Sequence, residues 1–112
     1  MSVPWEITPE KVDRAVARLA ALARPRRLIL FGSYVRGTAD DNSDLDILVV
    51  TRDEVQDPRK ESVRLRRALR DIAMPLDILV VSERQLGGLA DHPGLIYGEA
   101  LRTGRVVYES AA

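Results

Sequence analysis

The stretch "FGSYVRGTADDNSDLDILVV" (residues 31–50) joins two apolar segments through a polar turn and places two aspartates at the start of the second segment. Aspartate is a poor strand former and is costly to bury. Because side chains alternate faces along a strand, Asp44 and Asp46 would point to the same side, with Cα atoms about 6.6 Å apart. The apolar residues that alternate with them, beginning with Leu45, would then face a core.

The close spacing of the two aspartates has an electrostatic cost. Two carboxylates about 5 Å apart repel by roughly 3 kcal/mol at an effective dielectric constant of 20. A cation held between them would remove that repulsion. A solvent-exposed strand edge, or salt bridges to nearby arginines, would also accommodate the pair, and Asp44 and Asp46 alone do not decide between these alternatives.

A second copy of the same apolar hexapeptide adds a third acid. "LDILVV" occurs at residues 45–50 and again at 76–81, so Asp77 has the same local context as Asp46. If the two strands are neighbours, three carboxylates converge on one end of a sheet. Oxygen ligands alone suit magnesium or manganese. The chain has no cysteine and one histidine, His92, which argues against a thiolate or histidine-rich zinc site.

The turn that precedes the aspartates has features of a phosphate site. Gly32 ends an apolar run and would let a ligand approach the backbone closely. Ser33 supplies a hydroxyl, and the turn that follows would present free N–H groups to an anion. Most Gly-Ser pairs only mark a turn, and no Gly-x-x-x-x-Gly-Lys motif of the P-loop type is present.

Periodicity and turn residues along the chain predict one domain that spans residues 1–112, of α/β (α+β) class, with a mixed sheet flanked by helices. Strands are predicted at residues 27–31, 44–50, 76–81 and 105–109. Helices are predicted from Pro9 to just before Pro25, as one turn at 33–37, at 59–73, after a capping box of Ser82 and Gln85, and in a last helix that ends at Gly104.

Together these positions follow the pattern Gly-Ser-x-x-x-Gly-x-x-x-x-x-Ser-Asp-x-Asp, formed by Gly32-Ser33, Gly37, Ser43-Asp44 and Asp46. This pattern resembles the signature of the nucleotidyltransferase superfamily with a DNA polymerase beta type of palm. The small size and the ending "EALRTGRVVYE" resemble the minimal nucleotidyltransferase (MNT) group. Many of its members are antitoxins of HEPN/MNT toxin–antitoxin pairs, and the resemblance extends over nearly the whole chain.

The resemblance implies a mechanism and a partner. Asp44, Asp46 and Asp77 would be the catalytic carboxylates that hold Mg²⁺ or Mn²⁺, while Gly32 and Ser33 would bind the phosphates of ATP. AMP would pass to a hydroxyl acceptor, for which a tyrosine of a HEPN-type RNase toxin is the leading candidate. The alternative is a catalytically silent antitoxin that neutralises its partner by stoichiometric occlusion.

Composition limits the classes of partner. The chain has 17 basic and 17 acidic residues, so it is not a globally basic nucleic-acid binder. No apolar run is long enough to cross a membrane, and a soluble cytoplasmic protein is expected. The sequence leaves open whether the basic helix face within residues 59–70 is solvated or faces RNA or protein. For Arg36 it favours a structural ion pair with Asp40 or Asp41 over a phosphate contact, without fixing its role. It also leaves open the roles of Tyr34 and Trp5, the nucleotide, the acceptor and the oligomeric state.

Overall fold

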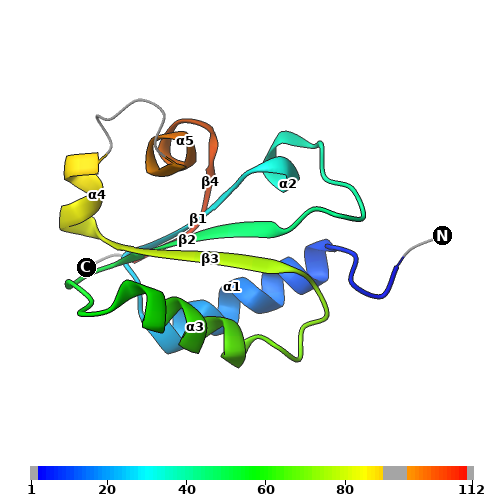
Figure 1. Cartoon of the computed structure of the whole chain (residues 1–112), viewed down its shortest axis with the longest axis horizontal. Coiled ribbons are helices and arrows are strands. Elements are labelled where there is room, and N and C mark those ends of the chain that lie inside the picture. Colours follow the sequence, from blue (N-terminus) through cyan, green and yellow to red (C-terminus); the bar gives the residue numbers. More distant parts are fainter. Residues whose placement is uncertain (1–2, 90–95, 111–112) are drawn as a thin grey trace.

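The computed structural model of the chain describes residues 3–89 and 96–110 (Figure 1). Its helices and strands follow one another in the predicted order, which confirms an α+β fold. The elements are α1 (Pro9–Ala23), β1 (Arg27–Phe31), α2 (Ser33–Arg36), β2 (Leu45–Thr51), α3 (Pro58–Ala68), β3 (Leu76–Ser82), α4 (Glu83–Leu89), α5 (Ile96–Thr103) and β4 (Arg105–Glu109). The turn predicted at residues 91–94, which includes His92, lies outside the described residues.

The strands form a mixed sheet in the order β3-β2-β1-β4. β1 runs antiparallel to both of its neighbours, whereas β2 and β3 are parallel and are joined through α3. The two "LDILVV" segments therefore lie side by side, and they pair residue for residue, from Leu45 opposite Leu76 to Thr51 opposite Ser82. This register brings Asp46 and Asp77 next to each other.

Helices cover the two faces of the sheet unequally. α1 and α3 lie on one face, and α2, α4 and α5 lie on the other (Figure 1). The larger core lies under α1 and α3 and includes Leu45, Ile47 and Val49, which are fully buried. The smaller core on the opposite face includes Leu48 and Val50. Asp46 shares this second face, at the end of β2 that precedes the buried residues.

The helix predicted at residues 59–73 begins one residue earlier, at Pro58, and ends five residues sooner, at Ala68. The helix tightens there, because the N–H groups of Leu69 and Arg70 bond to carbonyls three residues back. Arg18 of α1 donates to the Ala68 carbonyl at 3.0 Å and also bonds the Asp71 carboxylate. That carbonyl would otherwise accept the N–H of Ile72 in a continued helix. The Ile72 N–H bonds to the Leu69 carbonyl instead, and the side chain of Ile72 still enters the core.

Local capping at the other helix ends agrees with the predictions. Thr8 accepts the Lys11 N–H at the start of α1, where Pro9 is the first helical residue. Ser82 and Gln85 form the predicted capping box, each side chain accepting the other's backbone N–H, at 3.1 and 3.3 Å. Across the described ranges, no helix has the length and apolar character needed to cross a membrane.

Candidate active site

The three predicted carboxylates lie at the ends of β2 and β3 where both parallel strands begin. Asp46 and Asp77 are register partners, so their side chains project from the same face of the sheet. Asp44 precedes β2 by one residue. Asp46 is half-buried, whereas Asp44 and Asp77 are exposed. The structure thus brings the three aspartates to one end of the sheet, as expected if the two strands are neighbours.

Gly32 has a specific structural relation to Asp46. The last residue of β1, Phe31, pairs with Asp46, and Gly32 follows with φ of 82° and ψ of −158°. A Cβ atom on Gly32 would lie 2.1 Å from Oδ2 of Asp46. The group that approaches this glycine in the structure is therefore the Asp46 carboxylate, a close contact that sequence spacing alone did not reveal.

Burial and like charges raise the pKa of Asp46 to about 6, from an ordinary value of 3.8. Loss of solvation is the largest cause, followed by the negative charges of Asp77, Asp44 and Glu99, while Arg36 acts in the opposite direction. The protein's own cations thus leave the negative charge around Asp46 only partly compensated. Such an environment favours a bound cation or a proton.

Arg36 and Glu99 form a second charged feature beside the carboxylates. Nη1 of Arg36 lies 3.0 Å from Oε1 of Glu99, and both side chains are about half exposed. The sequence favoured a structural ion pair for Arg36, which is confirmed, but the expected partner, Asp40 or Asp41, was wrong. Glu99 belongs to α5, and no short-range spacing connects it to the aspartates.

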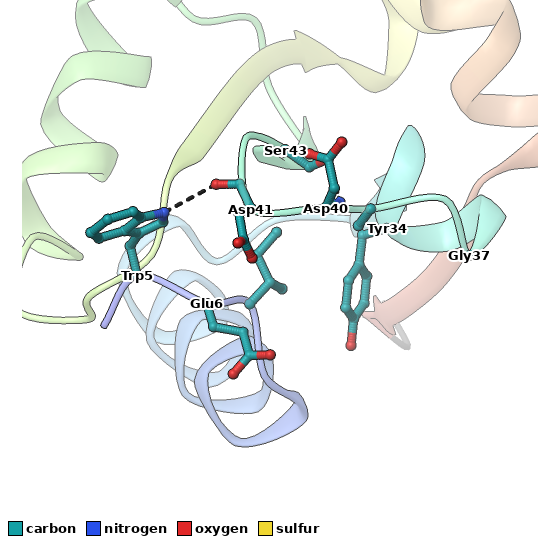
Figure 2. A pocket seen from close by; sticks show the side chains of 9 residues that line it. Trp5, Glu6, Tyr34, Gly37, Asp40, Asp41 and Ser43 are labelled. Atoms are coloured by element: carbon teal, nitrogen blue, oxygen red, sulfur yellow. Dashed lines mark hydrogen bonds between the residues drawn. The ribbon is translucent and has the colours of Figure 1, made fainter. Parts of the chain in front are cut away.

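The polar turn before β2 is ordered by its own side chains. Ser43 Oγ accepts the Asp40 N–H at 2.9 Å, and Oδ1 of Asp40 accepts the Asn42 N–H at 2.8 Å. Trp5 donates its indole N–H to the Asp41 carbonyl at 3.0 Å (Figure 2). Ser43 therefore stabilises the start of the strand, and the N-terminal segment is fastened to the turn that precedes Asp44.

Trp5 and Tyr34, whose roles the sequence left open, both line a pocket beside this turn (Figure 2). The pocket has a volume of about 300 Å³. Trp5 is 49% exposed, so it covers the turn without entering the core. Tyr34 is partly buried and packs against the larger core.

The donor set at the sheet end suits a hard divalent cation, because it consists of carboxylate oxygens without nitrogen or sulfur ligands. The positions are adjacent, but the side chains are not gathered around a single point. Within residues 3–89 and 96–110, no three acidic, histidine or cysteine side chains are close enough together to hold one metal ion. Mutual repulsion, which adds to the effect of burial in raising the pKa of Asp46, opposes such gathering in the absence of a cation.

The pKa of Asp46 leads to a prediction about stability. Because its folded pKa of about 6 exceeds 3.8, ionised Asp46 destabilises the fold above pH 6, and the cost fades as the pH falls toward 4. The shift corresponds to at most about 3 kcal/mol and, after solvent screening, to about 1 kcal/mol. Asp46→Asn should therefore melt a few degrees higher than the parent in metal-free buffer near neutral pH, with no difference near pH 4, as measured by circular dichroism.

A lower melting temperature for Asp46→Asn would contradict this expectation. It would mean that arginines hold the ionised carboxylate as a structural group. Asp41→Asn is the matched control, since it removes one charge from the adjacent turn without touching Asp46, and its melting temperature should stay close to that of the parent across the same pH range.

The mixed sheet, the Gly-Ser turn and the aspartates beyond it define a nucleotidyltransferase class of domain. The family model described as "Nucleotidyltransferase domain" matches residues 10–95, and the chain belongs to this family. A search of curated protein sequences found no significant match.

Solved structures extend the comparison. The chain is 30% identical to a protein described as a minimal nucleotidyltransferase, covering 89% of this chain and 96% of that one, with a TM-score of 0.58. A toxin–antitoxin structure with AMP-PNP is 21% identical, covering 88% and 74%, with a TM-score of 0.58. A mutant of the toxin–antitoxin MntA-HpeT is 17% identical, covering 95% and 76%, with a TM-score of 0.60. The predicted resemblance to minimal nucleotidyltransferases is confirmed.

Proposed function

We propose that residues 1–112 form one metal-dependent nucleotidyltransferase domain that transfers AMP from ATP to a hydroxyl group. The proposed acceptor is a tyrosine of a HEPN-type RNase toxin, so the protein would act as an antitoxin. The observation that carries the proposal is the in-register pairing of Asp46 with Asp77, with Asp46 seated against Gly32. The toxin–antitoxin neighbour described with AMP-PNP supports the choice of an adenine nucleotide and of a toxin partner.

Each residue of the site has a proposed role. Asp44, Asp46 and Asp77 would hold Mg²⁺ or Mn²⁺, which when bound would neutralise the triphosphate and stabilise the attacking and leaving oxygens. Ser33 makes no side-chain hydrogen bond among the described residues, and its hydroxyl would donate to a phosphate oxygen, next to Gly32.

The proposed reaction forms one bond and breaks another. A carboxylate oxygen of Asp77, which is exposed at the strand edge, would accept the proton of the acceptor hydroxyl. The acceptor oxygen would then bond to the α-phosphorus, the α–β phosphoanhydride bond would break, and pyrophosphate would leave. Without a metal, Asp46 is largely protonated below pH 6, so binding of the metal should weaken as the pH falls below that value. The cytoplasm supplies the ATP and magnesium that this reaction needs.

A second candidate is an antitoxin that blocks its partner by occlusion, without turnover. Three neighbouring acids whose charge is only partly compensated argue against it, because a pure binding protein gains nothing from their mutual repulsion. The two candidates differ in stoichiometry, since a catalyst is regenerated and a blocker is consumed.

A stoichiometry assay tests this proposal. The protein, at about a hundredth of the concentration of a HEPN-type RNase, should inactivate the RNase with time when ATP and magnesium are present, because one enzyme molecule modifies many partners. Residual RNase activity and a mass increase of the partner by one or more AMP groups are the measurements. Inactivation that needs a full equivalent and proceeds equally well with EDTA and no ATP would establish the occluding antitoxin instead.

A further inference from the structure

A groove follows the free edge of β3, which is one of the two outer strands of the sheet. One hollow of about 470 Å³ extends from Asp77 to Val80, and a second of about 460 Å³ continues from Val80 to Gly88 of α4. The two hollows share Pro58, Val80 and Tyr97 in their linings. They therefore form one path that begins at a candidate catalytic carboxylate.

The strand edge contributes main-chain groups to this path. Ser62 of α3 donates its hydroxyl to the Ile78 carbonyl at 2.5 Å, so the backbone of Ile78 points away from β2. Alternate residues of a strand direct their N–H and C=O groups to the same edge. The backbone of Val80 therefore also points into the groove, where an extended chain could pair with it.

Two arginines of α3 line the same groove. Arg59 and Arg66 are seven residues apart, so they lie on one side of the helix about 10.5 Å from each other. Within the described part of the chain neither has an ion-pair partner, whereas Arg64 of the same helix is bonded to Glu61 at 2.6 and 2.9 Å. The groove thus has two guanidinium groups without an ion-pair partner, at a spacing between about two and four residues of extended chain.

We propose that this groove binds an extended acidic segment of the acceptor protein and presents its hydroxyl group at the Asp77 end. This inference rests on the proposed function, since it gives the acceptor of that reaction its binding surface. Acidic side chains two or four residues apart project from the same side of an extended chain, so they would pair with Arg59 and Arg66 while the main chain of the segment pairs with Val80. The strand edge and apolar floor favour a peptide over RNA, and so does the formal net charge of zero.

The decisive probe is a fluorescent random copolymer of glutamate and tyrosine, with a lysine–tyrosine copolymer and poly(U) for comparison. Fluorescence anisotropy without nucleotide should show that the chain prefers the acidic copolymer. Arg59→Glu with Arg66→Glu should weaken its binding by about tenfold or more, through lost attraction and new repulsion. The matched control, Arg67→Glu with Arg70→Glu, makes the same charge change outside this groove and should change binding by less than about twofold.

Three outcomes would overturn the proposal. The two double variants could lose the same amount of binding affinity, the protein could show no preference for the acidic copolymer, or Arg59 and Arg66 could be needed for binding of poly(U) instead. If charge reversal lowers the melting temperature, Arg59→Gln with Arg66→Gln replaces it, with the same expected direction.

Calorimetry with ATP and magnesium separates this inference from the proposed function. If the protein binds the acidic copolymer but not ATP, the proposed groove is supported and the proposed enzymatic function is contradicted. If the Arg59 and Arg66 variant transfers AMP to the partner at the parental rate, the enzymatic function is supported and the role of the groove in binding the acceptor is contradicted.

Discussion

Replacement of Asp44 and Asp46 by asparagine should abolish nucleotide transfer while the fold remains intact. Both side chains lie at the open end of β2, and neither one's carboxylate accepts a hydrogen bond from a described residue, so their charge is available to a ligand. Without these charges the metal loses two of its three proposed protein ligands, and the rate should fall by at least about a thousandfold. Incorporation of radiolabelled AMP into the partner measures the rate, and calorimetry measures binding of ATP with magnesium.

The control for this double variant removes the same charge nearby. Asp41→Asn with Asp53→Asn changes two exposed aspartates. Their backbone carbonyls accept hydrogen bonds from Trp5 and Thr51, and these bonds do not depend on the side-chain charge. Transfer by this control should stay within about twofold of the parent. A large loss of thermal stability in the Asp44 and Asp46 variant would show that the acids are structural, and it would contradict the proposed metal site.

Strand positions were predictable from the sequence because each strand has a compact apolar run with clear turn residues beside it. Residues 27–31 and 105–109 form strands with the predicted bounds. The sequence predicted that three carboxylates converge if the strands with the repeated hexapeptide are neighbours, and the parallel pairing of these strands places Asp77 next to Asp46. The acidic end of the sheet therefore followed from local patterns and one assumption about strand order.

Features that depend on tertiary contacts were not predictable in the same way. At the early end of α3 the Ala68 carbonyl accepts a hydrogen bond from Arg18, which is 50 residues away in the sequence. Glu99 pairs with Arg36 because α5 packs beside the candidate site. The sequence separation between Glu99 and the aspartates follows no helix or strand periodicity that would have predicted this pair. Gly32 could be recognised as a turn residue, but its contact with Asp46 requires the β1–β2 register.

Gly32→Ala tests whether that contact shapes the site. The new methyl group would lie 2.1 Å from Oδ2 of Asp46, and the backbone at φ 82° and ψ −158° belongs to a region that only glycine occupies readily. Asp46 must then move or the turn must change, so we expect a loss of about 2–3 kcal/mol in unfolding free energy and of at least about a hundredfold in transfer rate. Urea denaturation and the AMP-incorporation assay provide the two measurements.

Gly37 offers a matched position for this test. It also has a positive φ, of 76°, but nothing lies within 4 Å of a Cβ placed on it. Gly37→Ala should therefore cost only the backbone strain, about 1 kcal/mol, and should retain most of the transfer activity. Equal losses of activity in the two variants would show that the contact between Gly32 and Asp46 does not matter for the reaction.

A double-mutant cycle separates the contact from the backbone strain at Gly32. In an Asp46→Ala background the clashing carboxylate is absent, so Gly32→Ala should destabilise the fold by about 1 kcal/mol less than it does in the parent. Additive effects would mean that the strain of the turn accounts for the whole cost. A coupling of about 1 kcal/mol or more would instead show that glycine is required at position 32 because the Asp46 carboxylate occupies the space of a side chain. The Gly-Ser turn and the Ser-Asp-x-Asp segment would then depend on each other through this one contact.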